Sequence, residues 1–525
     1  MKKMMFIIFI CLSYVAVAQQ ARMVMDISEG SSSTFDEGEV IQYGFDDKVL
    51  FTRSLGDQDR EFWVSDGTAD GTNKLFDYSS PSIIREFDDN GDELIFLFRD
   101  SGVYYLASLD KITLDTTLLV ANSEFMNELT KFNGAYFYNM NDDLWKYDLA
   151  TNEQELIYEF EGFFGLKRIG VYNSQLILIA GENDGVYLFS SDGTKAGTIS
   201  YYFIYSGSSI ADYNEYFTQS GNLLYFFYYK PSDGKYSLYC TDGTQAGTIK
   251  LIDLETPSGF VNLEEKREIA AWNNKLLFRA APESGSSFDE LYVSDGTING
   301  THIIDTDDDP DNEGKPSYFT KYKGELYFSG AYKSPWIARM YKTDGTQQGT
   351  KFLEFSSISS IGAVGITVFN DSLCFSAYKS WHGDEFAFAT GTDNSERFVD
   401  VLPDEDYSSA NSFVATDKYL FFSGKTTEHG RELWVYDPDT VLVGTNELLI
   451  QPLSLSPNPC SDILSINSGS NRFDDFSIYF YSSDGKLVLK KPYEELNNIE
   501  SLEPGMYKVV ICTKNGVFAD WIRKK

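Results

Sequence analysis

The stretch Ser294-Asp295-Gly296-Thr297-Ile298-Asn299-Gly300-Thr301 decides the fold, because the chain repeats it five times with little change. Each copy reads Ser or Thr, then Asp-Gly-Thr, two variable residues and Gly-Thr, and it follows a run of aromatic and β-branched residues. Successive late copies lie about 50 residues apart, which is the spacing of a repeat that folds as four strands. The aspartates of the five copies are Asp66, Asp192, Asp242, Asp295 and Asp344.

The Asp-Gly pair in this phrase predicts a tight hairpin turn. Such turns need positive φ angles, which Gly adopts without strain and Asp tolerates. The Asp carboxylate and the Thr hydroxyls can also bond nearby backbone N–H groups. We therefore expect the five aspartates to shape turns rather than to bind a metal or a ligand.

Weaker copies of the repeat bring the count to nine units. Each unit has an early strand such as Lys323-Gly324-Glu325-Leu326-Tyr327-Phe328 and ends on a strand after the turn phrase. Within one unit we expect four antiparallel strands, at residues 318–321, 325–329, 339–343 and 350–355. This pattern predicts an all-β fold, a single closed β-propeller over residues 22–450 with nine blades, or eight as the alternative. Two smaller propellers are the other possibility.

The N-terminal segment suggests how the ring closes. Residues 23–27 have the form of a fourth strand that lacks the three strands before it. The last unit lacks a proper fourth strand, because Pro438 and a degraded turn follow Asp437. Pairing these two segments removes an open sheet edge. We expect the N-terminal strand to complete the last blade.

The two ends of the chain differ from the repeats. Lys2 and Lys3, an apolar run at 4–15 and Ala16-Val17-Ala18 predict a signal peptide over residues 1–18 with cleavage after Ala18. The apolar run is shorter than the roughly 18 residues of a membrane span, so we expect no transmembrane segment in the mature chain. Beyond residue 452 the repeat is lost, and short strands separated by turns predict a small β-sandwich over residues 452–525.

Charge and cysteine content exclude some partners. The formal charge of −36 would repel phosphate backbones, so nucleic acid is not an expected partner. Cys240 and Cys374 lie in strand-like runs and read as small buried hydrophobes. Cys460 and Cys512 share the final segment, where they could form a disulfide or remain free thiols.

The tail resembles a known family. Ser456-Pro457-Asn458-Pro459, Asp484-Gly485-Lys486-Leu487-Val488, Leu502-Glu503-Pro504-Gly505-Met506-Tyr507 and the basic end Arg523-Lys524-Lys525 resemble the type A C-terminal sorting domain of the type IX secretion system. The resemblance implies a bacterium of the Bacteroidetes group, export through the periplasm and recognition by the secretion machinery. It also implies a location on the outer cell surface or in the medium.

The repeat region resembles the ELWxxDGT-repeat proteins. The matching residues are Glu290 to Thr297, Glu61 to Thr68 and Glu432-Leu433-Trp434. The resemblance implies architecture and no defined activity.

Few residues suggest chemistry. The three histidines fall in different units, so they predict no imidazole metal site. Asp307, Asp309 and Asp311 stand in an acidic loop where alternate carboxylates could bind Ca²⁺, although the loop departs from a helix-loop-helix calcium site. Otherwise we expect no cofactor.

Two classes of function remain open. The first is a non-catalytic binding scaffold for a glycan or protein ligand, in which Trp336 and Trp381 are candidate ligand contacts in loops of neighbouring units. The alternative is a glycan-active hydrolase or lyase with carboxylates in the propeller funnel.

Overall fold

In this computed structural model every regular element of the described residues is a β-strand. The chain divides into two compact units, of which one is Met23–Tyr436 and the other includes Asp437–Lys525. We call Met23–Tyr436 the repeat domain and the described part of 454–525 the tail domain. The structure describes residues 21–29, 32–35, 41, 43–55, 59–79, 85–161, 165–206, 217–230, 234–255, 268–281, 289–306, 314–331, 338–358, 360–361, 365–379, 383–399, 401–402, 408–438, 454–467, 477–482, 487–492, 496–513 and 516–525.

The repeat domain begins with six antiparallel sheets of four strands each, in which spatial order follows chain order. They are β2 (Tyr43–Phe45), β3 (Lys48–Ser54), β4 (Asp59–Ser65) and β5 (Asn73–Ser79); β6 (Arg85–Asp89), β7 (Glu93–Asp100), β8 (Val103–Asp110) and β9 (Thr116–Asn122); β10 (Met126–Phe132), β11 (Ala135–Met140), β12 (Asp143–Asp148) and β13 (Glu153–Tyr158); β14 (Leu166–Tyr172), β15 (Gln175–Glu182), β16 (Gly185–Ser191) and β17 (Ile199–Tyr205); β18 (Thr218–Ser220), β19 (Leu223–Lys230), β20 (Lys235–Thr241) and β21 (Ile249–Leu254); and β22 (Ile269–Trp272), β23 (Lys275–Ala280), β24 (Glu290–Ser294) and β25 (His302–Ile304).

The remaining strands form one larger sheet and one further four-stranded sheet. The short strand β30 pairs with both β28 and β32, and so joins two groups of four strands into a nine-stranded sheet. The strands of the larger sheet are β26 (Ser317–Tyr322), β27 (Glu325–Ala331), β28 (Ala338–Thr343), β29 (Lys351–Phe352), β30 (Ser360–Ile361), β31 (Thr367–Phe369), β32 (Ser372–Lys379), β33 (Gly383–Ala389) and β34 (Arg397–Val399). The last sheet contains β35 (Asn411–Ala415), β36 (Leu420–Thr426), β37 (Gly430–Tyr436) and β1 (Ala21–Met23).

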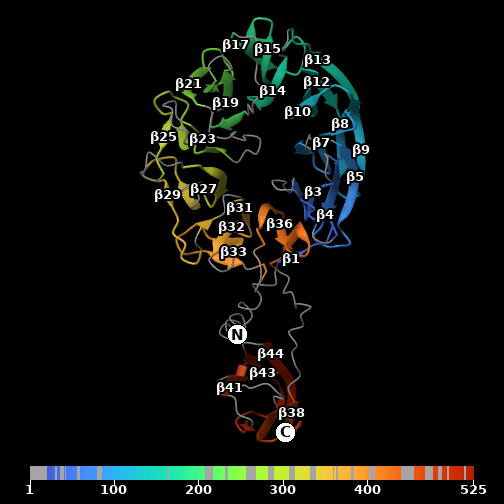
Figure 1. The fold of residues 1–525 in the computed structure, drawn as a ribbon, viewed down its shortest axis with the longest axis vertical. Helices are drawn as coiled ribbons and strands as arrows, with labels where there is room; N and C mark the ends of the chain where they lie inside the picture. The colour runs from blue at the N-terminus through green and yellow to red at the C-terminus, as the bar shows by residue number, and fades with distance from the viewer. Residues whose placement is uncertain are drawn as a thin grey trace. The chain divides into compact units, whose positions relative to one another are not determined.

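These sheets follow one another around a central opening (Figure 1). First strands such as β10 and β14 lie nearer the middle, and fourth strands such as β9 and β13 lie on the outside (Figure 1). This all-β arrangement of four-stranded antiparallel sheets is a propeller fold, as the repeat predicts.

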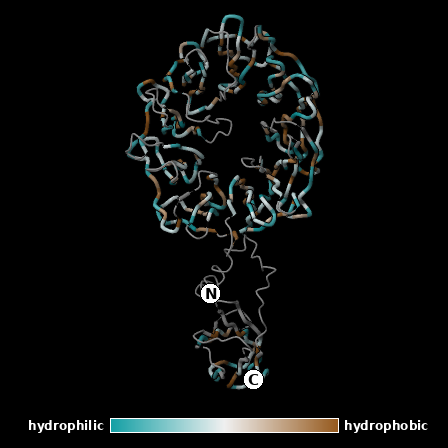
Figure 2. The backbone as a smooth tube through the Cα atoms, viewed as in Figure 1, coloured by the Kyte–Doolittle hydropathy of each residue, from teal (hydrophilic) through white to brown (hydrophobic). Residues whose placement is uncertain are grey.

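The core of the repeat domain lies between consecutive sheets. Phe227 of β19 and Phe278 of β23, for example, belong to one buried cluster with ring centroids 5.3 Å apart. Hydrophobic residues are accordingly distributed around the whole domain rather than gathered at one place (Figure 2). Each sheet is therefore stabilised mainly by the apolar area that it buries against its neighbours.

The N-terminal strand lies beside the last sheet. The spatial order is β1-β37-β36-β35, so β1 occupies the outer position that a fourth strand would take. The strand covers Ala21–Met23, whereas the sequence predicted a strand at residues 23–27. Beyond the end of the strand, the Val24 N–H still donates to the Leu433 carbonyl at 2.9 Å.

The tail domain consists of two sheets that face a common core. One sheet contains β38 (Ser454–Ser456), β39 (Ile463–Asn467) and β42 (Leu496–Asn498). The other contains β40 (Ser477–Ser482), β41 (Leu487–Pro492), β43 (Gly505–Thr513) and β44 (Gly516–Lys524), in the order β41-β40-β43-β44. The buried residues between them include Leu464, Phe480 and Ile522. Cys460 is buried in this core as a free thiol, so the possible disulfide with Cys512 does not form.

The recurring turn forms a closed hydrogen-bond network. In the copy at Asp295, Oδ1 of the carboxylate accepts from the backbone N–H and the hydroxyl of Thr297, at 2.9 and 2.7 Å. The Thr297 hydroxyl accepts from the Gly300 N–H at 2.9 Å, and Thr301 donates to the Thr297 carbonyl at 2.8 Å. The same contacts recur at Asp66, Asp192, Asp242 and Asp344.

Both glycines of the phrase are needed for steric reasons. Gly296 has a φ of +87° and lies against the preceding sheet, where an added Cβ would be 2.2 Å from Leu223 Cδ1. At the second glycine, an added Cβ would lie 2.0 Å from the Asp Oδ1 atom, in all five copies. The carboxylate thus occupies the space that a side chain at the second glycine would fill.

Replacement of Gly247 by Ala should destabilise the repeat domain by about 2 kcal/mol, because the new methyl group overlaps Asp242. The same replacement should cost clearly less in an Asp242→Ala background, where the overlap is removed. Urea unfolding of the wild type, both single variants and the double variant measures this difference. Equal losses in the two backgrounds would contradict the steric explanation.

Candidate functional site

The residues predicted to bind calcium lie outside the described residues. Asp307, Asp309 and Asp311 fall between β25 and β26. Among the residues that the structure does describe, there is no group of three or more His, Cys, Asp or Glu side chains that could hold a metal ion. The calcium site stays a prediction.

The two candidate ligand contacts also lie outside the described residues. Trp336 falls between β27 and β28, and Trp381 falls between β32 and β33. Both connections join the second and third strands of a repeat, and the two repeats are neighbours in the chain. A role for these tryptophans in binding stays a prediction.

The structure does not bring the five turn aspartates together. Each lies between the third and fourth strands of a different repeat, and its Oδ1 atom accepts hydrogen bonds from a Thr two residues later. The hydroxyl of Thr297 lowers the pKa of Asp295 by this hydrogen bond. Each of these carboxylates therefore accepts hydrogen bonds within its own turn.

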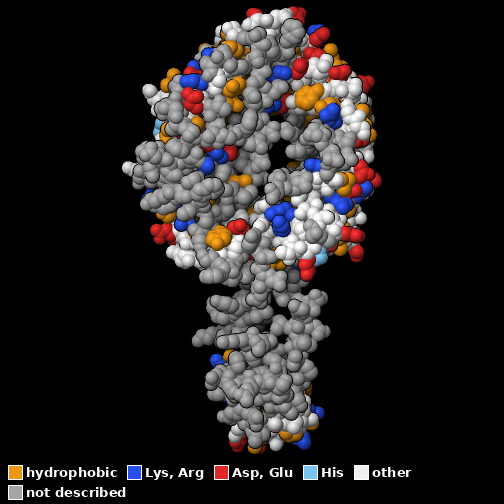
Figure 3. Space-filling model, viewed as in Figure 1, with side chains coloured by type: hydrophobic (Ala, Val, Ile, Leu, Met, Phe, Trp, Pro, Cys, Tyr) orange, Lys and Arg blue, Asp and Glu red, His pale blue; other side chains and the backbone are white. Residues whose placement is uncertain are grey.

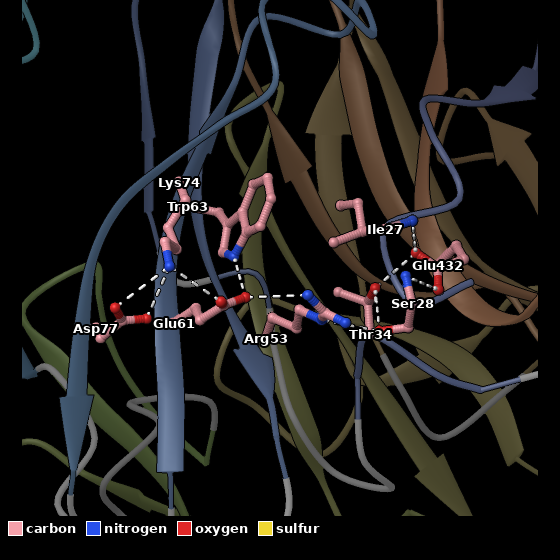
Figure 4. Close-up of polar contacts among 9 residues, drawn as sticks. All are labelled: Ile27, Ser28, Thr34, Arg53, Glu61, Trp63, Lys74, Asp77 and Glu432. Carbon is pink, nitrogen blue, oxygen red and sulfur yellow. Dashed lines mark hydrogen bonds and ion pairs between the residues drawn. The ribbon is translucent and has the colours of Figure 1, made fainter.

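The described residues contain a polar network that sequence reasoning missed. It lies where residues 23–29 and 32–35 meet β37 on one side and β3 on the other, and we call this region the seam. Glu432 of β37 is fully buried there. Its Oε2 atom accepts from the Ile27 N–H at 3.2 Å and the Thr34 hydroxyl at 2.6 Å, and Oε1 accepts from the Ser28 N–H at 3.4 Å (Figure 4).

The network continues from the N-terminal segment into the first sheet. The guanidinium of Arg53 donates to the Ser28 hydroxyl at 3.0 Å and to Glu61 at 3.1 Å (Figure 4). Glu61 also accepts from the indole N–H of Trp63 and from Lys74, at 3.0 and 3.3 Å. One chain of polar contacts thus links the last sheet, the N-terminal segment and the first sheet.

A second buried glutamate makes the same kind of contact one repeat earlier. Glu385 of β33 accepts from the backbone N–H groups of Val401 and Ser408, at 3.3 and 2.9 Å, and from the Ser408 hydroxyl. Glu385 and Glu432 occupy the same register position, opposite Ala377 and Gly424 of the adjacent strands. In both repeats the glutamate therefore holds the chain that leads to the next sheet.

The sequence does contain a signal for this role. A glutamate precedes an apolar residue and Trp in Glu432-Leu433-Trp434 and Glu61-Phe62-Trp63. A charged residue recurring inside an otherwise apolar strand is costly to bury unless it is hydrogen-bonded, which indicates a buried acceptor.

Burial raises the pKa of Glu432 to about 7. The hydrogen bonds from Thr34, Ile27 and Ser28 act in the opposite direction, and the nearby Asp26 carboxylate raises the pKa further. Oδ2 of Asp26 is in turn 3.0 Å from Nδ1 of His429, the residue that directly precedes β37. The partners of Glu432 are groups of this chain, so the arrangement holds the seam together.

Charged side chains are distributed unevenly on the face drawn in Figure 3. Asp and Glu side chains are spread along the outer rim of the repeat domain, and several Lys and Arg side chains lie nearer its middle (Figure 3). This pattern agrees with a solvated acidic surface.

The tail domain matches a known family. Residues 454–523 match the family model of the secretion system C-terminal sorting domain. The tail is a type IX sorting domain. Its presence indicates export to the cell surface or the medium. A search of curated protein sequences found no match.

Solved structures similar to the chain are distant in sequence. Dipeptidyl peptidase 4 of Porphyromonas gingivalis is 10% identical with a TM-score of 0.43, over 78% of this chain and 65% of that chain, so the chain spans about two thirds of the peptidase. The β-propeller domain of the Trilobed protease of Pyrococcus furiosus is 12% identical with a TM-score of 0.32, over 72% and 97%. Oligogalacturonate lyase of Vibrio parahaemolyticus is 13% identical with a TM-score of 0.35, over 77% and 99%.

Within the described ranges, no helix is long and apolar enough to cross a membrane.

Replacement of Glu432 by Ala should destabilise the repeat domain by about 2 to 4 kcal/mol near pH 5, because it leaves three donors at the seam without their acceptor. The raised pKa of Glu432 means that the folded state holds this proton more tightly than the unfolded state does. The stabilisation is therefore complete below the ordinary pKa of 4.5 and declines as the pH rises through about 7. The difference between wild type and variant should be larger at pH 5 than at pH 8.

Urea unfolding of the full chain at both pH values, followed by tryptophan fluorescence, measures the two differences. Glu428→Ala is the matched control, because the Glu428 side chain is 86% exposed in the same hairpin. A loss at Glu428 equal to that at Glu432, or a difference that grows with pH, would contradict the role of the buried carboxyl group.

Proposed function

We propose that this protein is a non-catalytic binding scaffold, a closed propeller that the type IX secretion system delivers to the cell surface or the medium. A glycan or a protein is the proposed ligand, held by connections that differ between repeats. The single observation that carries the proposal is the sorting domain at 454–523, which links the repeat domain to export.

The delivery proposal has two parts. The signal peptide over residues 1–18, cleaved after Ala18, would take the chain across the inner membrane, and the tail domain would take it across the outer membrane. Recognition by the secretion machinery would occur through the tail. The proposal covers either release or retention at the surface.

The ring is proposed to be closed and to have nine blades. The nine-repeat count agrees with the sheets once the nine-stranded sheet is read as two blades joined by β30. Closure is supported by the position of β1 beside β37. It is also supported by a buried cluster that combines Phe51 of β3 with Phe421 of β36 and Val435 of β37.

Ligand contacts are proposed for the connections between the second and third strands. The turn between the third and fourth strands has nearly the same sequence in five repeats, so its residues differ little from one repeat to the next. The second connection, in contrast, ranges from residues 183–184 between β15 and β16 to residues 281–289 between β23 and β24. Trp336 and Trp381 belong to this variable set. Asp307, Asp309 and Asp311, between β25 and β26, are the proposed ligands of a calcium ion.

Deletion of residues 454–525 should stop export while leaving the repeat domain folded. The test is expression of the full chain and of the deletion variant in a bacterium that has the type IX system, followed by immunoblots of medium, cell surface and periplasm. The full chain should reach the surface or the medium, and the variant should accumulate in the periplasm as a protease-resistant protein. Equal export of both would overturn the delivery proposal.

Binding is tested with the full chain on a glycan array, combined with a polysaccharide degradation screen. Binding without any product supports the scaffold. Formation of product would favour the alternative, a glycan-active hydrolase or lyase.

A further inference from the structure

The four-stranded sheet of the tail domain has one buried and one exposed face. Along β43 and β44, buried Tyr507, Val509 and Ile522 alternate with side chains that face outward. The buried set packs on the core that the two sheets share. No described sheet packs on the opposite face, so the side chains on that face lie at the surface of the tail domain.

The exposed face combines large apolar side chains with cations. Met506, Trp521 and Val488 remain 46, 42 and 42% exposed. Lys508 lies directly opposite Trp521, and Arg523 lies directly opposite Met506. We call Val488, Lys490, Met506, Lys508, Trp521 and Arg523 the basic-apolar face.

Within the described part of the tail, the cations of this face form no ion pair with a carboxylate. Among the described side chains, no carboxylate forms an ion pair with Lys490, Lys508 or Arg523, although the neighbouring Lys524 points to the buried side and pairs with Asp462 at 2.8 Å. Lys490 instead lies over the ring of Tyr479 at 5.2 Å. An apolar patch next to cations that no described carboxylate neutralises is typical of a surface that binds a partner.

The charge of the tail differs sharply from that of the rest of the chain. Residues 454–525 hold nine Lys and Arg against nine Asp and Glu, so the whole net charge of −36 belongs to residues 1–453. An acidic partner would therefore repel the bulk of the protein and attract this face. Such a charge contrast orients two molecules before they touch and selects one face for contact.

We propose that the basic-apolar face is the surface by which the tail domain docks on an acidic protein surface of the secretion machinery. The inference rests on the proposed function and adds to it the face and the chemistry of the partner. Trp521 and Met506 supply the apolar centre of the contact, because large flexible or aromatic side chains contribute most to such interfaces. Lys490, Lys508 and Arg523 surround this centre and meet the carboxylates of the partner.

The test uses full-length variants in a bacterium with the type IX system. Lys508→Glu/Arg523→Glu and Met506→Ser/Trp521→Ser should each reduce the exported fraction about tenfold, which corresponds to the loss of about 1.4 kcal/mol of binding free energy. Lys508→Arg/Arg523→Lys keeps the charge and should be exported normally. Ile463→Ser is the apolar control, because Ile463 is 54% exposed on β39 of the other sheet. Unchanged thermal unfolding of each purified chain establishes that the fold is kept.

The possible outcomes are distinguishable. Normal export of the face variants, together with retention of the chain that lacks 454–525, overturns the docking face and leaves the proposed function intact. Normal export of the deletion variant overturns both. Vesicles of phosphatidylglycerol provide the remaining comparison, because face variants that lose vesicle binding but keep normal export would assign the face to lipid and overturn the protein partner.

Discussion

The hydrogen bonds from the N-terminal segment to the carboxyl group of Glu432 join residues that are 398 to 405 positions apart in the chain. The first sheet of the repeat domain buries apolar side chains against the second sheet on one side and against the last sheet on the other. A buried carboxylate is costly in free energy unless several donors satisfy it. Glu432 meets this condition only while Ile27, Ser28 and Thr34 lie at the seam. These hydrogen bonds therefore depend on the same arrangement of the sheets that they stabilise.

The recurring turn has a different role, because it gives the same local structure to repeats whose other residues differ. Asp295, Thr297 and Thr301 satisfy one another within a few residues, so the turn needs no help from outside its own phrase. Gly296 then allows close contact with the preceding sheet. The turn and the buried glutamates thus stabilise the fold, and the sequence varies between repeats mainly in the other connections. This division agrees with the proposed role as a scaffold for binding.

The sequence predicted the strands and the turns because their causes are local. Asp-Gly needs a particular backbone conformation, and alternating aromatic residues need a sheet, whatever surrounds them. It also predicted that the N-terminal segment would lie on the last sheet, although β1 ends at Met23 and the later residues bend to Glu432.

The role of Glu432 could not be predicted in the same way, because its donors include the backbone N–H groups of Ile27 and Ser28, which any residue possesses. The position of a cation such as Lys508 opposite Trp521 likewise depends on strand register and is absent from the linear pattern. The predictions at Asp307 and Trp336 fall outside the described residues, and they stay predictions.

The central claim is that one closed ring of nine blades is completed by its own N-terminal strand. Electron microscopy of the purified full chain tests this most directly, because class averages viewed along the axis reveal the number of blades. We expect a single ring with nine blades around one opening. Two separate discs, or a ring with eight blades, would contradict the account.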